Sequence, residues 1–186
     1  MNKYVIVFIT FFLGYFIVNS IYEEINRDKT PGKAKRLSCQ KKVTSFERGF
    51  SNPEITYVQK LIEHGNTKFT SYVEKAVYSE SVLFDYITLV QTDEIFKNNL
   101  EKYVKYNENN DESFSLQYYI YENDKNDPGK KTKKSKSYAG YTVFEVKNKN
   151  NKTIYKVQID FMDNKGKDIK NSIQCAVKSF MTFNKQ

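Results

Sequence analysis

The chain has 186 residues, of which 30 are Lys or Arg and 22 are Asp or Glu, so its formal net charge is +8. Two cysteines are too few for a disulfide-rich scaffold, and a single histidine argues against a zinc site built from Cys and His. A hydrophobic content of 39% excludes a wholly disordered chain, and the basic excess favours anionic partners without saying which.

Residues 1–22 have the features of a targeting segment. No charged residue lies between Tyr4 and Ile21, and a helix of that length rises roughly 27 Å, close to the ~30 Å hydrocarbon thickness of a bilayer. Tyr22 and Tyr4 would lie at the two interfaces, which favours a retained membrane anchor. A lone lysine before the apolar run is also typical of a signal peptide, cleaved near Ser20. Both interpretations stay open, and we prefer the anchor.

Residues 23–45 are interpreted as a basic linker. Between Arg27 and Lys42 there are seven basic residues and one acidic residue, and no apolar periodicity. By the positive-inside rule, the Lys and Arg residues of this linker would place the following domain in the cytoplasm. However, long domains are translocated largely regardless of charge. We expect a domain at 46–186 that lies outside the cytoplasm.

The first half of this domain predicts helices. Ser51 and Glu54 have the spacing of a capping box, and apolar residues then recur at helical intervals. The range 69–77 also has helical spacing and predicts a second helix, which we extend through 82–90. A third helix is expected over 92–104.

After residue 112 the periodicity becomes that of strands. Apolar and polar residues alternate most clearly over 153–161. Four strands are expected, over 113–121, 138–146, 153–161 and 172–181. Because short turns join most of them, they should form an antiparallel meander with one face on the helices. The predicted fold is α+β: an N-terminal transmembrane helix, a basic linker, about three helices and a four-stranded antiparallel meander.

A lysine-rich loop separates the first two expected strands. It has no apolar residue to hold it, so we expect it to be mobile. As a binding element it could contact several phosphates at once, and a solvated loop that keeps the sheet soluble is the simpler interpretation. The candidate anion-binding residues are Lys125, Lys130, Lys131, Lys133, Lys134 and Lys136.

Two further features are candidates for covalent modification. Cys39 and Cys175 could form a disulfide outside the cytoplasm, joining the linker to the last expected strand; inside it, Cys175 would be a buried thiol. Asn151, followed by Lys152 and Thr153, matches the N-glycosylation pattern on a predicted turn, which matters only in a eukaryotic secretory compartment.

The sequence carries no catalytic signature. It has no GxSxG, Walker, GxGxxG or HExxH motif, and its one histidine, His64, lies at a predicted helix end where it suits the helix dipole. We therefore expect no enzymatic activity, no cofactor and no metal site.

These observations favour a binding or scaffold role. The leading hypothesis is a single-pass membrane protein whose extracytoplasmic domain binds other membrane or envelope proteins. The alternative is a cleaved, secreted basic protein that binds an anionic lipid or other polyanion through the lysine loop. Nucleic acid is not an expected partner. A third hypothesis, a cytoplasm-facing tether for lipid or nucleic acid, depends only on the charge of the linker.

Overall fold

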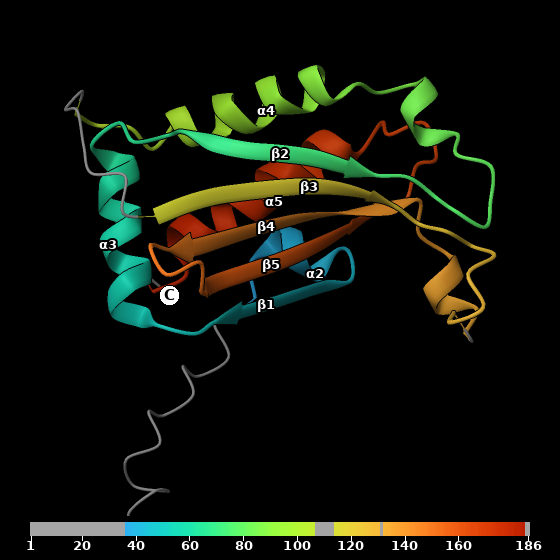
Figure 1. Cartoon of the computed structure of the whole chain (residues 1–186), viewed down its shortest axis with the longest axis horizontal. Helices are drawn as coiled ribbons and strands as arrows, with labels where there is room; N and C mark the ends of the chain where they lie inside the picture. Colours follow the sequence, from blue (N-terminus) through green and yellow to red (C-terminus); the bar gives the residue numbers. More distant parts are fainter. Residues whose placement is uncertain (1–35, 107–113, 131, 185–186) are drawn as a thin grey trace, which may run out of the picture. The chain divides into compact units, whose positions relative to one another are not determined.

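Four α-helices and five β-strands make up the part of the chain that the structure describes. The computed structural model describes residues 36–106, 114–130 and 132–184 (Figure 1). The helices are α2 (Ser38–Lys41), α3 (Asn52–Glu63), α4 (Leu89–Glu101) and α5 (Ile169–Thr182). The strands are β1 (Ser45–Gly49), β2 (Phe69–Glu74), β3 (Phe114–Glu122), β4 (Gly140–Asn148) and β5 (Thr153–Phe161). Two 3-10 turns are η1 (Leu83–Asp85) and η2 (Lys134–Lys136).

The strands form one mixed sheet in the order β1-β5-β4-β3-β2. β3, β4 and β5 are consecutive antiparallel neighbours, and β1 pairs with the far side of β5. β2 lies parallel to β3, because the chain crosses back through α4 between these two strands. The α+β class is therefore confirmed, whereas the predicted four-stranded meander is a three-stranded meander inside a five-stranded mixed sheet.

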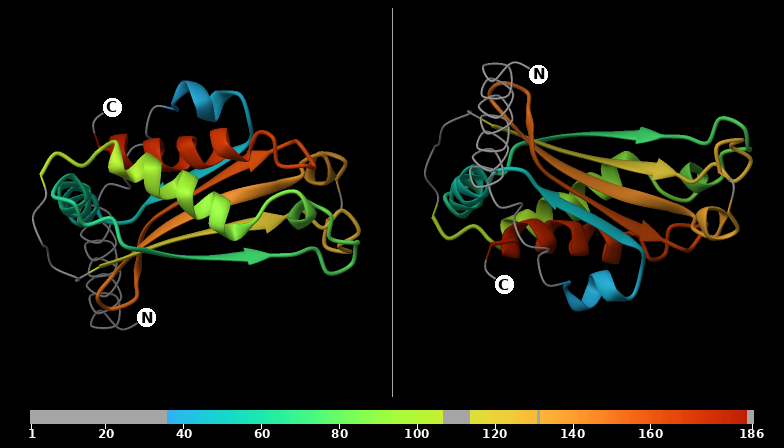
Figure 2. Two further views of the ribbon diagram at one scale, coloured as in Figure 1. Left: turned by 90° about the horizontal axis from the view of Figure 1, so that it is seen from above. Right: turned by 90° about the horizontal axis from the view of Figure 1, so that it is seen from below.

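The helices α2, α4 and α5 pack on one side of the sheet. α5 packs against β4 and β5, behind the sheet in Figure 1, and α4 packs against α5 and β2. Figure 2 shows α2 and α5 on the same side of the sheet. This arrangement leaves the other side of the sheet without a described helix in front of it (Figure 1).

Aromatic rings fill the space between the sheet and the helices. Phe96 of α4 stacks on Tyr118 of β3 with ring centroids 4.3 Å apart, and it meets Phe144 edge to face at 5.1 Å. Phe180 of α5 lies 5.4 Å from Phe144 and 5.0 Å from Tyr155. These four ring contacts thus join α4, α5 and three neighbouring strands into one core.

The two tyrosines in this core have partners for their hydroxyl groups. The Tyr155 hydroxyl donates to Glu47 Oε1 at 2.6 Å, and the Tyr118 hydroxyl bonds to Asp93 and to Thr92. Burial raises the pKa of both phenols far above the ordinary value. Such partners are needed because a buried hydroxyl without one is costly.

The segment 172–181 is part of helix α5 and not a strand. Its alternating Ile173, Cys175 and Val177 imitate a strand pattern, but all three are buried because α5 is in contact with the sheet, with α4 and with α2. The helix does have an exposed polar stripe, because Asn171, Gln174 and Lys178 recur at helical spacing. The strand interpretation followed the apolar alternation and overlooked this stripe.

The segment 69–77 is strand β2 for most of its length and not a helix. Phe69 and Val73 pack on the core, whereas Tyr72 between them points the other way. The range 82–90 holds η1 and the start of α4, which begins after Thr88; the Thr88 hydroxyl accepts from Gln91 N.

The folded unit begins inside the range predicted as a linker. α2 and the first residue of β1 lie within 23–45, and β1 is short and mostly polar, so its pattern was not visible. In the described residues, we find no helix with the length and apolarity required to span a bilayer. The predicted anchor at 1–22 lies outside the described residues.

Candidate functional site

The sheet face that is turned away from α2, α4 and α5, here called the open face, is rich in tyrosine. Tyr119 and Tyr121 are two residues apart on β3 and therefore lie on the same side of the sheet. Register pairs Tyr119 with Tyr72 of β2, and Tyr121 with Tyr141 of β4. We call these four residues the tyrosine quartet.

The quartet consists of two stacked pairs. The rings of Tyr72 and Tyr119 have centroids 4.7 Å apart and planes 16° apart, and those of Tyr121 and Tyr141 are 4.7 Å and 3° apart. Cross-strand stacking of this kind restrains the rings before any ligand arrives. Tyr72 is 37% exposed and its three companions are half-buried, so part of the quartet reaches solvent. Its hydroxyl groups also form hydrogen bonds within the face, such as those between Tyr121 and Tyr141 and between Tyr119 and Lys156.

Lysine side chains lie against two rings of the quartet. Lys156 Nζ lies 5.9 Å from the Tyr119 centroid, and Lys130 Nζ lies 5.4 Å from that of Tyr121. Lys156 also forms an ion pair with Glu145. Lys147 Nζ forms a second ion pair with Glu145, 3.6 Å from its Oε2. These cations therefore have specific partners instead of forming a uniform basic surface.

The phenols of the open face stay protonated well above neutral pH. Burial raises the pKa of Tyr72 to about 12, and the neighbouring Tyr119, Glu74 and Glu145 add to the shift. The pKa of Tyr141 is raised as well, mainly by burial and then by Tyr121. At physiological pH these hydroxyls are hydrogen-bond donors and acceptors without charge.

Beyond the quartet the open face continues to the β1 edge of the sheet. Phe46, paired in register with Gln158, is 63% exposed. Arg48 follows on the same side of β1, and its guanidinium lies 4.9 Å from the Phe50 ring. A surface of tyrosine, phenylalanine and arginine with polar neighbours has the composition found at the centre of protein–protein interfaces.

The lysine loop is held by polar contacts, although the sequence offers no apolar residue to hold it. The Asn123 amide donates to Ser135 O at 3.1 Å and to Tyr138 O at 2.9 Å, and Lys130 Nζ bonds to Asn123 and to Asp124 O. Lys130 thus has partners within the fold, and the mobility of the loop stays a prediction.

The other described lysines of the predicted anion-binding set do not converge on one site. Lys125 Nζ donates to Asn164 Oδ1 at 3.2 Å, and Lys133 and Lys136 are exposed. Lys131 and the side chain of Lys134 lie outside what the structure describes.

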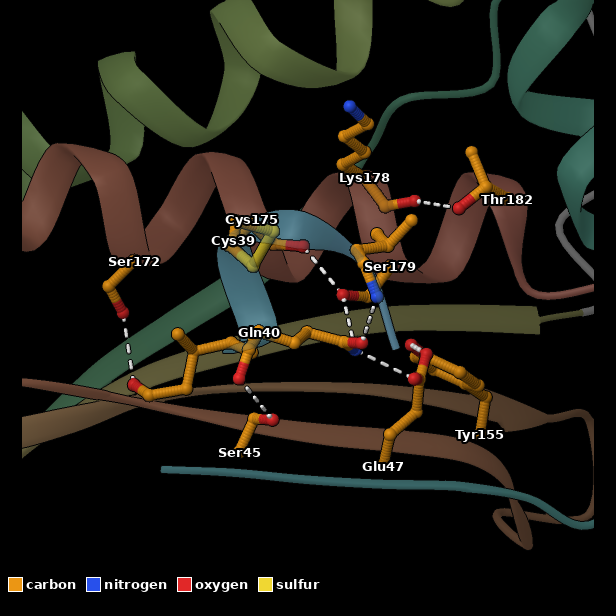
Figure 3. The surroundings of a disulfide bond; sticks show 12 residues. Cys39, Gln40, Ser45, Glu47, Tyr155, Ser172, Cys175, Lys178, Ser179 and Thr182 are labelled. Carbon is orange, nitrogen blue, oxygen red and sulfur yellow. Dashed lines mark hydrogen bonds between the residues drawn. A yellow bond between two sulfur atoms is a disulfide. The ribbon is translucent and has the colours of Figure 1, made fainter. Parts of the chain in front are cut away.

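Cys39 and Cys175 are joined by a disulfide in the structure, with Cα atoms 5.9 Å apart. The bond connects α2 to α5 (Figure 3) and so joins the start of the folded unit to its last helix, not to a strand. A cavity of about 410 Å³ lies beside it, lined by apolar and polar residues, the latter including Lys42, Asn171 and Lys178.

A buried polar network holds α2 next to the disulfide. The Gln40 side chain is 1% exposed and donates to Glu47 Oε2 at 2.7 Å and to Ser179 Oγ at 3.0 Å (Figure 3). Glu47 also accepts from Tyr155. Every member of this network has a structural partner, so we assign it a structural role.

Asn151 lies in the turn between β4 and β5, with φ of 58° and an exposed side chain. Thr153 begins β5. The triplet is therefore accessible, and its glycosylation stays a prediction. Among the described residues, no group of three or more His, Cys, Asp or Glu side chains could hold a metal ion.

Comparison with known proteins adds no relative: the chain matches no protein-family model, no curated protein and no solved structure.

The quartet is the feature that the sequence-based prediction missed. The alternation on 113–121 places Tyr119 and Tyr121 together, but Tyr72 joins them only when 69–74 is a strand, and Tyr141 only when the register of β4 is known.

Proposed function

We propose that this chain is a non-catalytic binding protein, held at a membrane by residues 1–22, whose extracytoplasmic domain binds another protein through the open face. The quartet supplies the centre of the contact surface, and Phe46 and Arg48 extend it across the sheet.

The observation that carries this proposal is the tyrosine quartet on a sheet face without a described helix in front of it. Rigid aromatic rings bring large contact areas at a low cost in conformational entropy, because few side-chain torsions have to be fixed on binding. Here the rings are already restrained by stacking. A hydroxyl both donates and accepts, so one that already has a neighbour on the face can form a further hydrogen bond to a partner's backbone, which favours a protein over a purely apolar ligand.

The disulfide between Cys39 and Cys175 supports the proposed compartment. Disulfides persist in oxidising environments and are rare in the cytosol. The proposal that 1–22 is an anchor follows from the sequence alone, as does the expectation that the partner is a membrane or envelope protein.

Site-specific photo-crosslinking tests the binding surface. A photoreactive phenylalanine analogue at Tyr72 or at Tyr141 should crosslink the full chain to one defined protein in the cells that produce it. The same analogue at Lys97, an exposed position on α4, serves as the control and should give no such product. Crosslinks of equal yield from all three positions, or none from the open face, would overturn the proposal.

The alternative function is that of a secreted basic protein, freed by cleavage near Ser20, that binds anionic surfaces. The exposure of Lys133 and Lys136 favours it. N-terminal sequencing of the mature protein separates the two, because the anchor hypothesis requires that residues 1–22 remain.

A further inference from the structure

Three loops meet at one end of the sheet, and we call this region the loop end: residues 75–86, 123–130 with 132–138, and 162–168. Figure 1 and Figure 2 both show the loops that follow β2 and β3 at the same end of the strands. Asp124 Oδ2 accepts from Val77 N at 2.7 Å, which joins the first loop to the second. Lys125 Nζ donates to Asn164 Oδ1, which joins the second to the third.

The carboxylate of Asp124 fixes the loop after β2. It accepts from the backbone N–H groups of Val77 and Tyr78 and from the Ser79 hydroxyl. Burial raises the pKa of Asp124, but these hydrogen bonds outweigh burial and bring the pKa down to about 2. The backbone is therefore held inward while the side chains of Val77 and Tyr78 point out, 83% and 62% exposed.

Exposed apolar side chains are concentrated at the loop end. Eleven large apolar residues are exposed in the described part of the chain, and five of them lie here: Val77, Tyr78, Val82, Tyr86 and Met162. The segments that carry them are in contact, because Lys165 Nζ lies 5.2 Å from the Tyr86 centroid. Such a concentration marks an interaction surface, since leaving it in water is unfavourable.

The outward charge of the loop end is positive. Among its described side chains six lysines are exposed, namely Lys75, Lys125, Lys133, Lys136, Lys165 and Lys167, against two exposed acids, Glu80 and Asp85. The other acids of the three loops accept hydrogen bonds from their own backbone, as Asp163 does from Lys165 N at 2.8 Å and Asp168 from Met162 N at 2.7 Å.

We propose that the loop end docks on a lipid bilayer that contains anionic phospholipid. Tyr78 and its apolar neighbours enter the headgroup region, where amphipathic rings are favoured, and the lysines around them pair with lipid phosphates and carboxylates. An acidic protein would satisfy the lysines but would leave Val77 and Val82 without an apolar environment. The inference is independent of the proposed role of the open face.

A tryptophan reporter tests this docking, because the chain contains no tryptophan. Full-length Tyr78→Trp protein is mixed with vesicles of phosphatidylcholine alone, or of phosphatidylcholine with phosphatidylserine, each also prepared with brominated acyl chains. On the anionic vesicles we expect emission at shorter wavelength and quenching by bromine. Tyr57→Trp on α3, where the native tyrosine is 46% exposed, is the matched control and should show neither, even if residues 1–22 insert.

A second variant separates charge from apolar contact. In the Tyr78→Trp chain, Lys133→Gln with Lys136→Gln should lower the ratio of docked to undocked loop end on the anionic vesicles about thirtyfold, as read from bromine quenching. A lysine near such a surface contributes about fivefold. A Tyr78→Trp emission that stays at the water value on both lipids overturns the proposal and leaves the loop end to a protein partner. Equal quenching on both lipids, or no effect of the lysine changes, contradicts its electrostatic part.

Discussion

Both faces of the sheet carry tyrosines, but the tyrosines have different roles on the two faces. On the covered face, Tyr118 and Tyr155 are 0% exposed, and each hydroxyl bonds to a carboxylate. On the open face, the quartet is partly exposed and its rings stack on one another.

This difference teaches that aromatic content by itself does not identify a core. A buried tyrosine stabilises the fold only when its hydroxyl has a hydrogen-bond partner. A half-exposed tyrosine contributes less to stability and retains a hydroxyl and a ring edge for a ligand. Substitutions on the covered face should therefore reduce stability, whereas those on the open face should reduce binding.

The largest expected effect comes from the disulfide on the covered side. The bond spans 136 residues, and in the chain-entropy description a loop of this size contributes up to about 5 kcal/mol. Replacement of both residues, Cys39→Ser with Cys175→Ala, should lower the free energy of unfolding by several kcal/mol in urea denaturation. If reduction of the native chain and this double variant both leave the urea midpoint unchanged, the bond does not constrain the fold.

Two positions on β4 allow a direct comparison of the faces. Phe144→Ala removes a fully buried ring that contacts Phe96 and Phe180, and should cost about 3–5 kcal/mol. Tyr141→Ala, three residues away on the open face, removes the stack on Tyr121. Loss of this stack should cost about 0.5–1.5 kcal/mol in addition to the free energy of the lost apolar burial. Equal losses in urea denaturation would show that both faces are core.

Removal of single hydroxyls sharpens the comparison. Tyr155→Phe leaves the carboxylate of Glu47 without one donor and should cost about 1–3 kcal/mol. Tyr141→Phe should change stability by less than about 0.5 kcal/mol, since water can reach this half-exposed position. Thermal unfolding of the two variants beside the native chain measures both; a larger loss for Tyr141→Phe would reverse our assignment.

The smallest effect concerns alkaline pH. The pKa of Tyr72 is raised from 10.0 to about 12, so the folded state holds this proton more tightly than the unfolded state does. Its contribution to stability is complete below pH 10 and is lost as pH rises towards 12. Tyr72→Phe should therefore flatten a part of the alkaline decline in stability. A decline of unchanged steepness in that variant would contradict the raised pKa.

The sequence alone predicted the elements whose patterns are simple. Alternation over 153–161 gave β5 with its bounds, and the helix predicted after Ser51 is α3. Both are amphipathic in the ordinary sense, with one face on the core and one face in water. Long-range contacts were not needed to find them.

The two misassignments have different physical causes. β2 presents Phe69 and Val73 to the core and Tyr72 to the open face, so aromatic residues lie on both of its sides and imitate a helical stripe. α5 was missed for another reason: its alternating Ile173, Cys175 and Val177 imitate a strand, although Asn171, Gln174 and Lys178 form a polar stripe at helical spacing. The quartet depends on β2 being a strand, so the error in one element concealed the candidate site.

The central claim, that the open face binds a partner, is tested most directly by tyrosine footprinting. Mild iodination followed by peptide mass spectrometry is applied to the purified full chain and to the same chain in native membranes. We predict that Tyr72 and Tyr141 react in the purified chain and are protected in membranes, whereas Tyr57 on α3 reacts in both. Equal reactivity of Tyr72 and Tyr141 in the two preparations would contradict the account.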